Sequence, residues 1–364
     1  VFLLAGAEDL VPRMKDNGDE DEFISSDQQY LIKRYVPRIE GLFARIEYIR
    51  KKNTTDSWWR VTTKDNITTW YGLDDTARIA DPDDNGRIFE WLPQLSTDHK
   101  GNVQRYTYLK ENKKGVSAQP GVHEHNRLND NAKFTNTYLK NVAYTPATPW
   151  YVPESYPYEP LTSNPLPDFL MKAVFDYGDH TDVSDDEATR DWTLRHDPFS
   201  SYHAGFEIRT YRQCKRVMMF HYFEELGDNT LVRSLNLEYK DKDLPAGTLS
   251  EADMIVSATQ TGYVYDEEGN VHSKSLPAMS FDYKPLQWDN TVHEVSAEDF
   301  RHAPQGLTGP YQWMDLEGEG ISGILSEQGG GWFYKNNLGN GHFAPARSVS
   351  PKPSFSGLGN MLQW

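Results

Sequence analysis

The sequence has a single cysteine, Cys214, among its 364 residues. One cysteine excludes an intramolecular disulfide and a metal cluster built from thiolates. The flanking residues Arg212, Lys215 and Arg216 are cationic, and nearby positive charge lowers the pKa of a thiol. These cations would suit a reactive thiol. We nevertheless interpret Cys214 as a structural thiol within a strand.

Long apolar runs are also missing. No stretch approaches the roughly 18 apolar residues that a membrane-spanning helix requires. No basic-then-apolar leader stands at the start of the sequence, so neither a signal peptide nor a membrane span is predicted. Because the sequence does not open with Met, we expect it to be part of a longer polypeptide. The absence of a leader then says little about where the protein is located.

Positive charge is scarce. The 54 Asp and Glu residues outnumber the 37 Lys and Arg residues, which gives a formal net charge of −17. A nucleic-acid surface needs clustered cations that displace the counterions of the phosphates. The basic pairs at 51–52 and 113–114 are isolated, so a nucleic-acid partner is excluded.

Catalytic motifs are absent as well. The sequence contains no Gly-x-Ser-x-Gly elbow, no His-Glu-x-x-His pair, no P-loop and no dinucleotide-binding glycine loop. Glycoside hydrolysis needs two facing carboxylates, and no pattern singles out such a pair among the acidic residues. We therefore predict a protein that is not an enzyme.

Aromatic residues, in contrast, are plentiful, at 13% of the chain. Large rings pack well on pleated sheets and are rare in disordered chains. Strand-like segments recur between turn residues, helix signals are few, and no alternation of strands and helices occurs, so an all-β fold is predicted. The predicted strands are 39–49, 58–63, 67–71, 87–95, 102–109, 169–177, 205–223, 231–239, 255–264 and 271–283.

The length favours two units, because single cores rarely grow beyond about 250–300 residues. We place a β domain at 1–303 and a Gly-rich unit at 304–364. Within the first, the Pro-rich residues 111–165 are predicted to be a long connecting excursion. In the second, short segments at 311–316, 321–327, 331–335 and 341–347 are typical of the four strands of one propeller blade.

One carboxylate motif has calcium-like spacing. Asp315, Glu317 and Glu319 alternate before Gly320, as oxygen ligands do in loops that wrap around calcium. Gly323 stands where the next anionic ligand belongs, and two Glu replace the usual shorter side chains. We favour a metal-free turn and no cofactor, and keep calcium as the alternative.

Three other polar motifs are weaker. Residues 81–86 (DPDDNG) open like an EF-hand loop, but Leu92 stands where the bidentate Glu is needed. The imidazoles in 123–125 (HEH) have no partner motif for zinc. The group at 179–182 (DHTD), followed by acidic residues at 185–187, suggests a metal or general-base site. We interpret it as a polar, solvated turn after a strand.

Several longer blocks resemble the SpvB-type N-terminal domain of the B components of bacterial Tc toxin complexes. The most specific is 195–212 (RHDPFSSYHAGFEIRTYR), which continues through 217–221 (VMMFH). The others are 69–75 (TWYGLDD), 88–94 (IFEWLPQ), 174–179 (VFDYGD) and 276–283 (LPAMSFDY). Residues 265–270 (YDEEGN) resemble a hairpin of the RHS type, and 312–325 and 336–343 resemble the first blade of an FG-GAP-type propeller.

This resemblance implies an RHS-like β-sheet shell segment followed by the start of a β-propeller. In that family the B component is structural: with the C component, an RHS protein, it forms a hollow shell around a toxic C-terminal region. The propeller closes the shell and docks on the pore-forming A component. The implied partners are thus the C and A components, and the implied location is secreted or extracellular. Some SpvB proteins carry a separate ADP-ribosyltransferase domain, whose surrounding motifs are missing around Glu317 and Glu319.

Two other functions remain open from the residues alone. Sugars stack on aromatic rings, so abundant rings and surplus carboxylates also suit a secreted glycan-binding or glycoside-hydrolysing β protein. The motif at 315–320 suits a calcium-dependent adhesion module.

Overall fold

The structure is a computed structural model. It describes residues 2–4, 9–116, 124, 127, 133–154, 157–161, 164–181, 186–226, 229–240, 253–266, 268–283, 291–299, 301 and 311–351. Two compact units divide the chain, Val1–Tyr283 and Lys284–Trp364. The elements are strands apart from short 3-10 turns such as η1 (Asp75–Ala77) and η4 (Glu224–Leu226). The predicted all-β class is confirmed.

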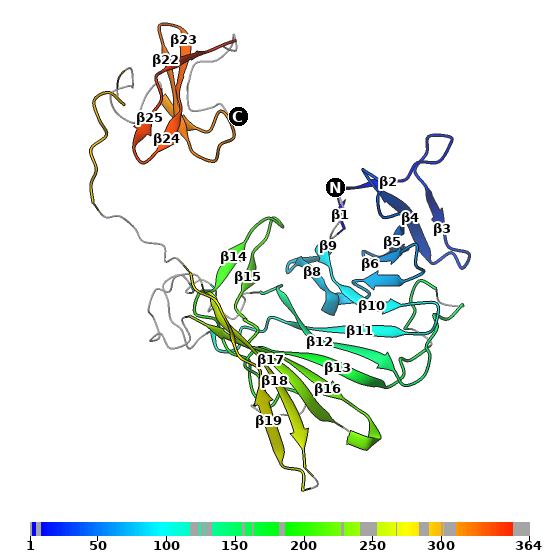
Figure 1. Cartoon of the computed structure of the whole chain (residues 1–364). Helices are drawn as coiled ribbons and strands as arrows, with labels where there is room; N and C mark the ends of the chain where they lie inside the picture. The colour runs from blue at the N-terminus through cyan, green and yellow to red at the C-terminus, as the bar shows by residue number, and fades with distance from the viewer. Residues whose placement is uncertain are drawn as a thin grey trace. The chain divides into compact units, whose positions relative to one another are not determined.

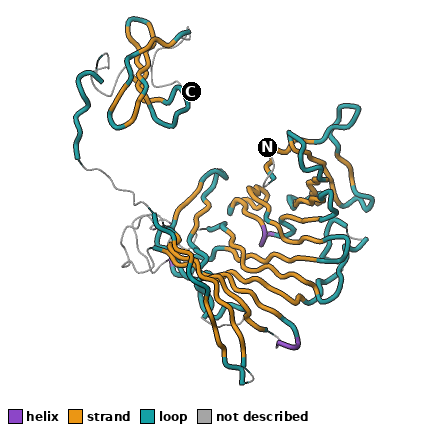
Figure 2. Tube along the Cα trace, in the orientation of Figure 1, coloured by secondary structure: helices purple, strands orange, loops and turns teal. Residues whose placement is uncertain are grey.

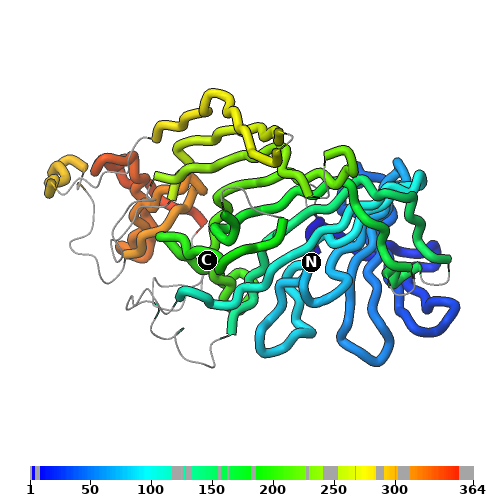
Figure 3. Tube along the Cα trace, turned by 90° about the horizontal axis from the view of Figure 1, so that it is seen from below, coloured from blue at the N-terminus to red at the C-terminus, as the bar shows by residue number. Residues whose placement is uncertain are grey.

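The first unit contains a 16-stranded antiparallel sheet whose strands follow one another almost in chain order (Figure 1). Figure 2 shows that loops join these strands at both ends, and Figure 3 shows the strands side by side. The path runs through β1 (Phe2–Leu3), β2 (Asp9–Pro12), β4 (Tyr30–Pro37), β5 (Arg45–Lys51), β6 (Ser57–Thr62), β7 (Thr68–Tyr71), β10 (Pro93–Thr97), β11 (Val103–Lys110), β12 (Thr137–Pro146), β13 (Phe169–Asp176), β16 (Arg216–His221), β17 (Thr230–Tyr239), β18 (Ile255–Tyr265) and β19 (Val271–Ser275). Off this path, β3 (Glu22–Ile24) pairs with β4, and β20 (Met279–Ser280) pairs with β18.

Two hairpins of this sheet share one turn sequence, Asp-x-x-Gly-Asn. At β10–β11 the Asp98 carboxylate accepts the N–H of Lys100 at 2.9 Å and the N–H of Asn102 at 3.0 Å. At β18–β19 the Asp266 carboxylate accepts the corresponding N–H groups. The glycines lie at φ 86° and 82°, a conformation that favours glycine. The hairpin at 265–270 was predicted and is confirmed.

The two faces of the sheet around β6 are both packed. Side chains on a strand alternate between faces, so Trp58 and Trp59 belong to different hydrophobic clusters. The first cluster is Tyr30, Ile32, Ile49, Trp58, Trp70, Leu95, Val103 and Trp150. The second is Leu10, Tyr35, Ile46, Trp59 and Val61.

Residues 111–165 are more than the connection that we predicted. β12 runs through their middle and pairs with β11 and β13 inside the sheet. Trp150 belongs to the first cluster, with Tyr158 packed against it. The Trp58 Nε1–H donates to the Tyr158 carbonyl at 3.0 Å. The proline content of residues 111–165 indicated breaks in regular structure. It did not indicate that these breaks lie on either side of a strand, β12, inside the main sheet.

Two short hairpins stand apart from the main sheet. Among the described strands, β8 (Arg78–Asp81) pairs only with β9 (Asp84–Trp91), and β14 (Phe199–Ser201) pairs only with β15 (Ile208–Thr210). The β14–β15 hairpin projects from the main sheet in Figure 1. The strands predicted at 87–95 and 205–223 are therefore each divided in the structure. In both cases the backbone leaves one sheet and enters another, which an apolar pattern alone does not show.

The second unit is a four-stranded antiparallel sheet of β21 (Tyr311–Met314), β22 (Gly323–Gln328), β23 (Gly331–Lys335) and β26 (Arg347–Val349). A separate hairpin, β24 (Asn337–Gly339) and β25 (His342–Phe343), precedes β26. We predicted the fourth strand at 341–347. In the structure that segment contains β25, and the fourth strand of the sheet is β26, which begins at Arg347.

The second unit begins at Lys284, earlier than the boundary that we predicted at 303–304. Asp299 accepts the N–H of Phe343 at 2.9 Å. The buried Lys335 donates from Nζ to the Arg301 carbonyl at 3.1 Å. These contacts join the residues before the boundary to the sheet that follows it.

Leu95→Ala should lower the free energy of unfolding by about 2–5 kcal/mol, because a fully buried side chain leaves a cavity in the first cluster. Leu235→Ala, on β17, is the matched control, since Leu235 is 42% exposed. Its effect should stay below about 1 kcal/mol. Urea denaturation of both variants measures the difference, and equal effects would contradict this account of the core.

Candidate functional site

The polar motif after β13 is buried. Asp179 and His180, which we predicted to lie in a solvated turn, are 2% and 1% exposed. The chain reverses at Gly178, where φ is 86° and an added Cβ would lie 2.4 Å from Thr193 Oγ1. Glycine is required there, and the solvated-turn interpretation is wrong.

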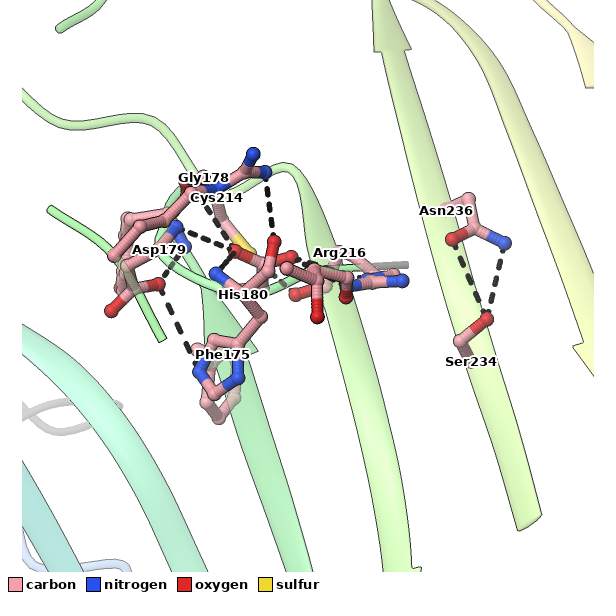
Figure 4. Close-up of polar contacts among 12 residues, drawn as sticks. Phe175, Gly178, Asp179, His180, Cys214, Arg216, Ser234 and Asn236 are labelled. Atoms are coloured by element: carbon pink, nitrogen blue, oxygen red, sulfur yellow. Dashed lines mark hydrogen bonds and ion pairs between the residues drawn. The ribbon is translucent and has the colours of Figure 1, made fainter. Parts of the chain in front are cut away.

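Asp176, the last residue of β13, organises this turn. One carboxylate oxygen accepts the N–H of Gly178 at 2.7 Å and the N–H of Asp179 at 3.0 Å. The other forms an ion pair with Arg216 at 3.0 Å, at the start of β16. The Asp176 carboxylate therefore joins the loop to the neighbouring strand. Figure 4 labels its partners Gly178, Asp179 and Arg216.

Lys140 reaches the same turn from β12. Its Nζ donates to Asp179 Oδ2 at 2.6 Å and to the Phe175 carbonyl at 3.3 Å. It also lies 2.8 Å from His180 Nε2, which accepts in this contact because an ammonium offers only donors. Burial alone would raise the pKa of Asp179, but the hydrogen bond and charge of Lys140 outweigh it and hold that pKa below its usual range.

Cys214 lies beside these residues, with Sγ 3.4 Å from the Arg216 carbonyl (Figure 4). Burial raises the pKa of its thiol to about 11. The flanking cations do not activate it, because Arg212 pairs with Glu111 and Arg216 with Asp176. The structural role predicted for Cys214 agrees with this geometry, but the residue lies just before β16, and not within a strand as we predicted.

A second buried pair joins Arg212 to Glu111. Both side chains are inaccessible to solvent. Arg212 Nε donates to Glu111 Oε2 at 2.9 Å, and its Nη1 donates to the Trp192 carbonyl at 3.3 Å. The guanidinium also lies over the Trp192 ring, 4.4 Å from its centroid. Three segments remote in sequence meet at this one cation.

A third pair explains part of the HEH motif. Glu124 is buried, accepts from the Tyr211 hydroxyl at 2.6 Å and pairs with Arg209. His123 and His125 lie outside the described residues. Next to this pair, Arg127 binds Glu207. Burial would raise the pKa of Glu207, but Arg127 and two hydroxyls outweigh it, and the pKa falls to about 2.

Two of the three carboxylates of the predicted calcium motif, those of Asp315 and Glu317, are engaged with the protein. Asp315 accepts the N–H groups of Glu319 at 3.0 Å and Gly320 at 2.6 Å. Glu317 pairs with Arg347. In the part of the chain that the structure describes, no group of three or more His, Cys, Asp or Glu side chains is placed to hold a metal ion. Calcium at Asp315, Glu317 and Glu319 stays a prediction.

The other two motifs also have local roles. Asp81 accepts the N–H of Asp83 at 2.9 Å and pairs with Arg87 at 2.7 Å, which closes the β8–β9 turn. Asp186 binds Lys172 and accepts from the Tyr222 hydroxyl. Asp182 and Asp185 lie outside the described residues.

Sequence reasoning missed Lys140, Glu111 and Arg212. A signal existed for Lys140, because it shares the period-two face of the buried Tyr138 on β12. In these three buried clusters each carboxylate faces a cation or hydroxyl of the same cluster. The arrangement therefore holds loops against strands. Among the described residues, no helix has the length and apolarity needed to cross a membrane.

Residues 1–223 match the family model described as Salmonella virulence plasmid 65kDa B protein. The chain belongs to the SpvB family. Two SpvB relatives, mono(ADP-ribosyl)transferases of Salmonella typhimurium (strain 14028s / SGSC 2262) and Salmonella choleraesuis (strain SC-B67), are each 34% identical over 227 residues. The match covers 61% of this chain and 37% of each relative.

Solved structures extend the likeness beyond the SpvB region. The crystal structure of TcdB2-TccC3-Cdc42 matches with a TM-score of 0.72 and 25% identity, over 95% of this chain and 16% of that one. The N-terminal domain of effector protein SpvB from Salmonella typhimurium strain LT2 matches with a TM-score of 0.59 and 30% identity, over 71% of this chain and 79% of that one. The resemblance to SpvB and Tc toxin B components is confirmed.

Glu111→Gln should lower the free energy of unfolding by about 3–5 kcal/mol, because it leaves the buried Arg212 without a counter-charge. The control Lys114→Met breaks an exposed pair with Asp191 and should change the free energy of unfolding by less than about 1 kcal/mol. The double variant Glu111→Leu/Arg212→Met should regain much of the loss. Urea denaturation distinguishes these outcomes, and a harmless Glu111→Gln would refute the stabilising role of the pair.

The pH dependence of stability follows from Glu207. Its pKa is lowered from 4.5 to about 2 by folding. The stabilisation that this lowered pKa gives is fully present above the pKa of the unfolded state. It is lost as the pH falls from about 4.5 to 2. Glu207→Gln should flatten the fall in melting temperature over this interval, whereas the exposed control Glu225→Gln should not. Identical acid profiles for both variants would contradict the assignment.

Proposed function

We propose that the chain is a non-enzymatic wall segment of a Tc-type toxin complex. In this proposal its large sheet forms part of the hollow shell that encloses the toxic C-terminal region of a C component. The second unit is the first blade of the propeller that docks on the pore-forming A component. The observation that carries the proposal is the match of 95% of this chain, at 25% identity, to the TcdB2-TccC3-Cdc42 structure.

The sheet has the physical features of a wall. Its 16 strands are all joined by strand pairing, with register shifts at a few positions, so they make one wide surface. The buried ion pairs Arg212–Glu111 and Arg216–Asp176 hold the long loops against the ends of the strands. Such a surface separates two compartments, which is the physical requirement for enclosing a toxic chain.

The absence of catalysis is part of the proposal. The curated relatives are named transferases, but the chain spans only 37% of their length. The N-terminal domain of effector protein SpvB, solved as a separate domain, has a similar fold. We place the chain in the secreted or extracellular toxin complex, as a structural component.

The test is a chimera of TcdB2 in which this chain replaces the region on which it superposes. Co-expressed with TccC3, the chimera should co-purify with it and give a hollow particle by electron microscopy. Unmodified TcdB2 is the positive control, and the chimera carrying Leu95→Asp, which buries a charge in the core, is the negative one. A folded chimera that forms no closed particle with TccC3 would reject the wall function.

A further inference from the structure

His180, which Figure 4 labels, is a buried titratable residue in the turn that follows β13. Its side chain is inaccessible to solvent, and its Nε2 lies 2.8 Å from Lys140 Nζ. An ammonium only donates hydrogen bonds, so Nε2 is unprotonated and the imidazole is neutral in the closed turn. Histidine ordinarily changes its charge near pH 6.5. The closed turn therefore contains a group that mild acid would protonate in water.

The charged groups around His180 oppose its protonation. They are Lys140 from β12, Asp176 from β13, Asp179 and Arg190 from the connection that follows, and Arg216 from β16. Two carboxylates thus face three cations, and the Tyr177 hydroxyl and the Cys214 thiol stay neutral because burial raises their pKa. Asp179 Oδ1 lies 3.9 Å from the imidazole, but Lys140 already binds this carboxylate at 2.6 Å. A protonated His180 would be a fourth cation, with its Nε2–H directed at the ammonium.

The backbone of the turn holds the next part of the chain in place. The Arg190 guanidinium donates to the Gly178 carbonyl and to the His180 carbonyl, both at 2.8 Å. The Asp179 carbonyl accepts the N–H groups of Thr189 at 2.9 Å and Arg190 at 3.1 Å. Opening of residues 178–180 therefore breaks these four hydrogen bonds and releases residues 189–190.

We propose that residues 177–180 form a pH-sensitive latch, which is closed while His180 is neutral and opens when His180 is protonated. In the open turn the imidazole reaches water and its Nε2 takes up a proton, which ends the contact with Lys140. Residues 189–190 then leave the turn. Mild acid thereby loosens the connection between β13 and β16, which carries the β14–β15 hairpin. This latch is additional to the wall function and does not depend on it.

The acid dependence of the latch has a definite sign and size. The open turn binds a proton that the closed turn excludes, so the closed turn loses stability relative to the open one as the pH falls below about 6.5. With complete exclusion, the open fraction rises about 30-fold between pH 7.5 and pH 5.0. The carboxylates of Asp179 and Glu207 titrate at lower pH, because their pKa values are lowered in the folded chain. The interval from pH 7.5 to 5.0 therefore isolates the effect of His180 from theirs.

Hydrogen exchange followed by mass spectrometry tests the latch in the 364-residue chain at pH 7.5 and pH 5.0. The intrinsic exchange rate at each pH, divided by the observed rate, gives a protection factor from which the chemical effect of pH is removed. The protection factor of residues 177–181 should fall at least about tenfold at pH 5.0. That of β5, elsewhere in the sheet, should fall by less than about tenfold.

Variants assign the acid response to His180. His180→Gln keeps an acceptor for Lys140 and takes up no proton in this interval, and Lys140→Met removes the ammonium, so that an imidazolium can pair with Asp179. In each variant the fall at residues 177–181 should stay below about tenfold. Either variant suffices if the other does not fold. The control His203→Gln, at an exposed position between β14 and β15, should respond as the unchanged chain does.

Three results would overturn the proposal. The first is a fall of less than about tenfold at residues 177–181 in the unchanged chain. The second is a matching fall in β5, which would mean general unfolding in acid. The third is a fall of about tenfold or more in a folded variant at His180 or Lys140, which would assign the response to another group.

Discussion

The ion pair between Asp176 and Arg216 is the contact on which the rest of the first unit depends. β13 and β16 are neighbours in the sheet although a long connection separates them in the chain. The pair closes that connection at its base, while Asp176 also caps the turn that follows β13. Lys140 and Asp179 extend the contact to β12. Buried charges are costly to desolvate, so each is satisfied by several partners within one cluster.

Local features of the chain could be predicted from the sequence because their causes are local. The hairpins at Asp98 and Asp266 follow from a carboxylate, a glycine and an asparagine within five residues. The all-β class follows from period-two patterns and abundant rings. The pairing of Glu111 with Arg212, 101 residues apart, could not be predicted, since nothing in either neighbourhood specifies the other.

The calcium-like spacing at residues 315–320 and the mistaken solvated-turn interpretation have one physical origin. A carboxylate that accepts backbone N–H groups two to five residues later requires the same spacing of acidic and glycine residues as a loop that binds calcium. Asp81, Asp98 and Asp315 all accept such N–H groups. Short acidic turns in β proteins therefore need a second criterion, namely whether their oxygens are already used by the backbone.

The order of strands in the sheet also bears on how the chain acquires its structure. Most strands pair with the strand before them in the sequence, from β4 to β7 and again from β10 to β13. Local pairing closes only short loops, so each new hairpin can form on the edge left by the previous one. The sheet can grow in the direction of translation, with its open edge always at the most recently synthesised strand. The connections from β7 to β10, from β11 to β12, from β12 to β13 and from β13 to β16 are points at which this growth must wait for a longer segment.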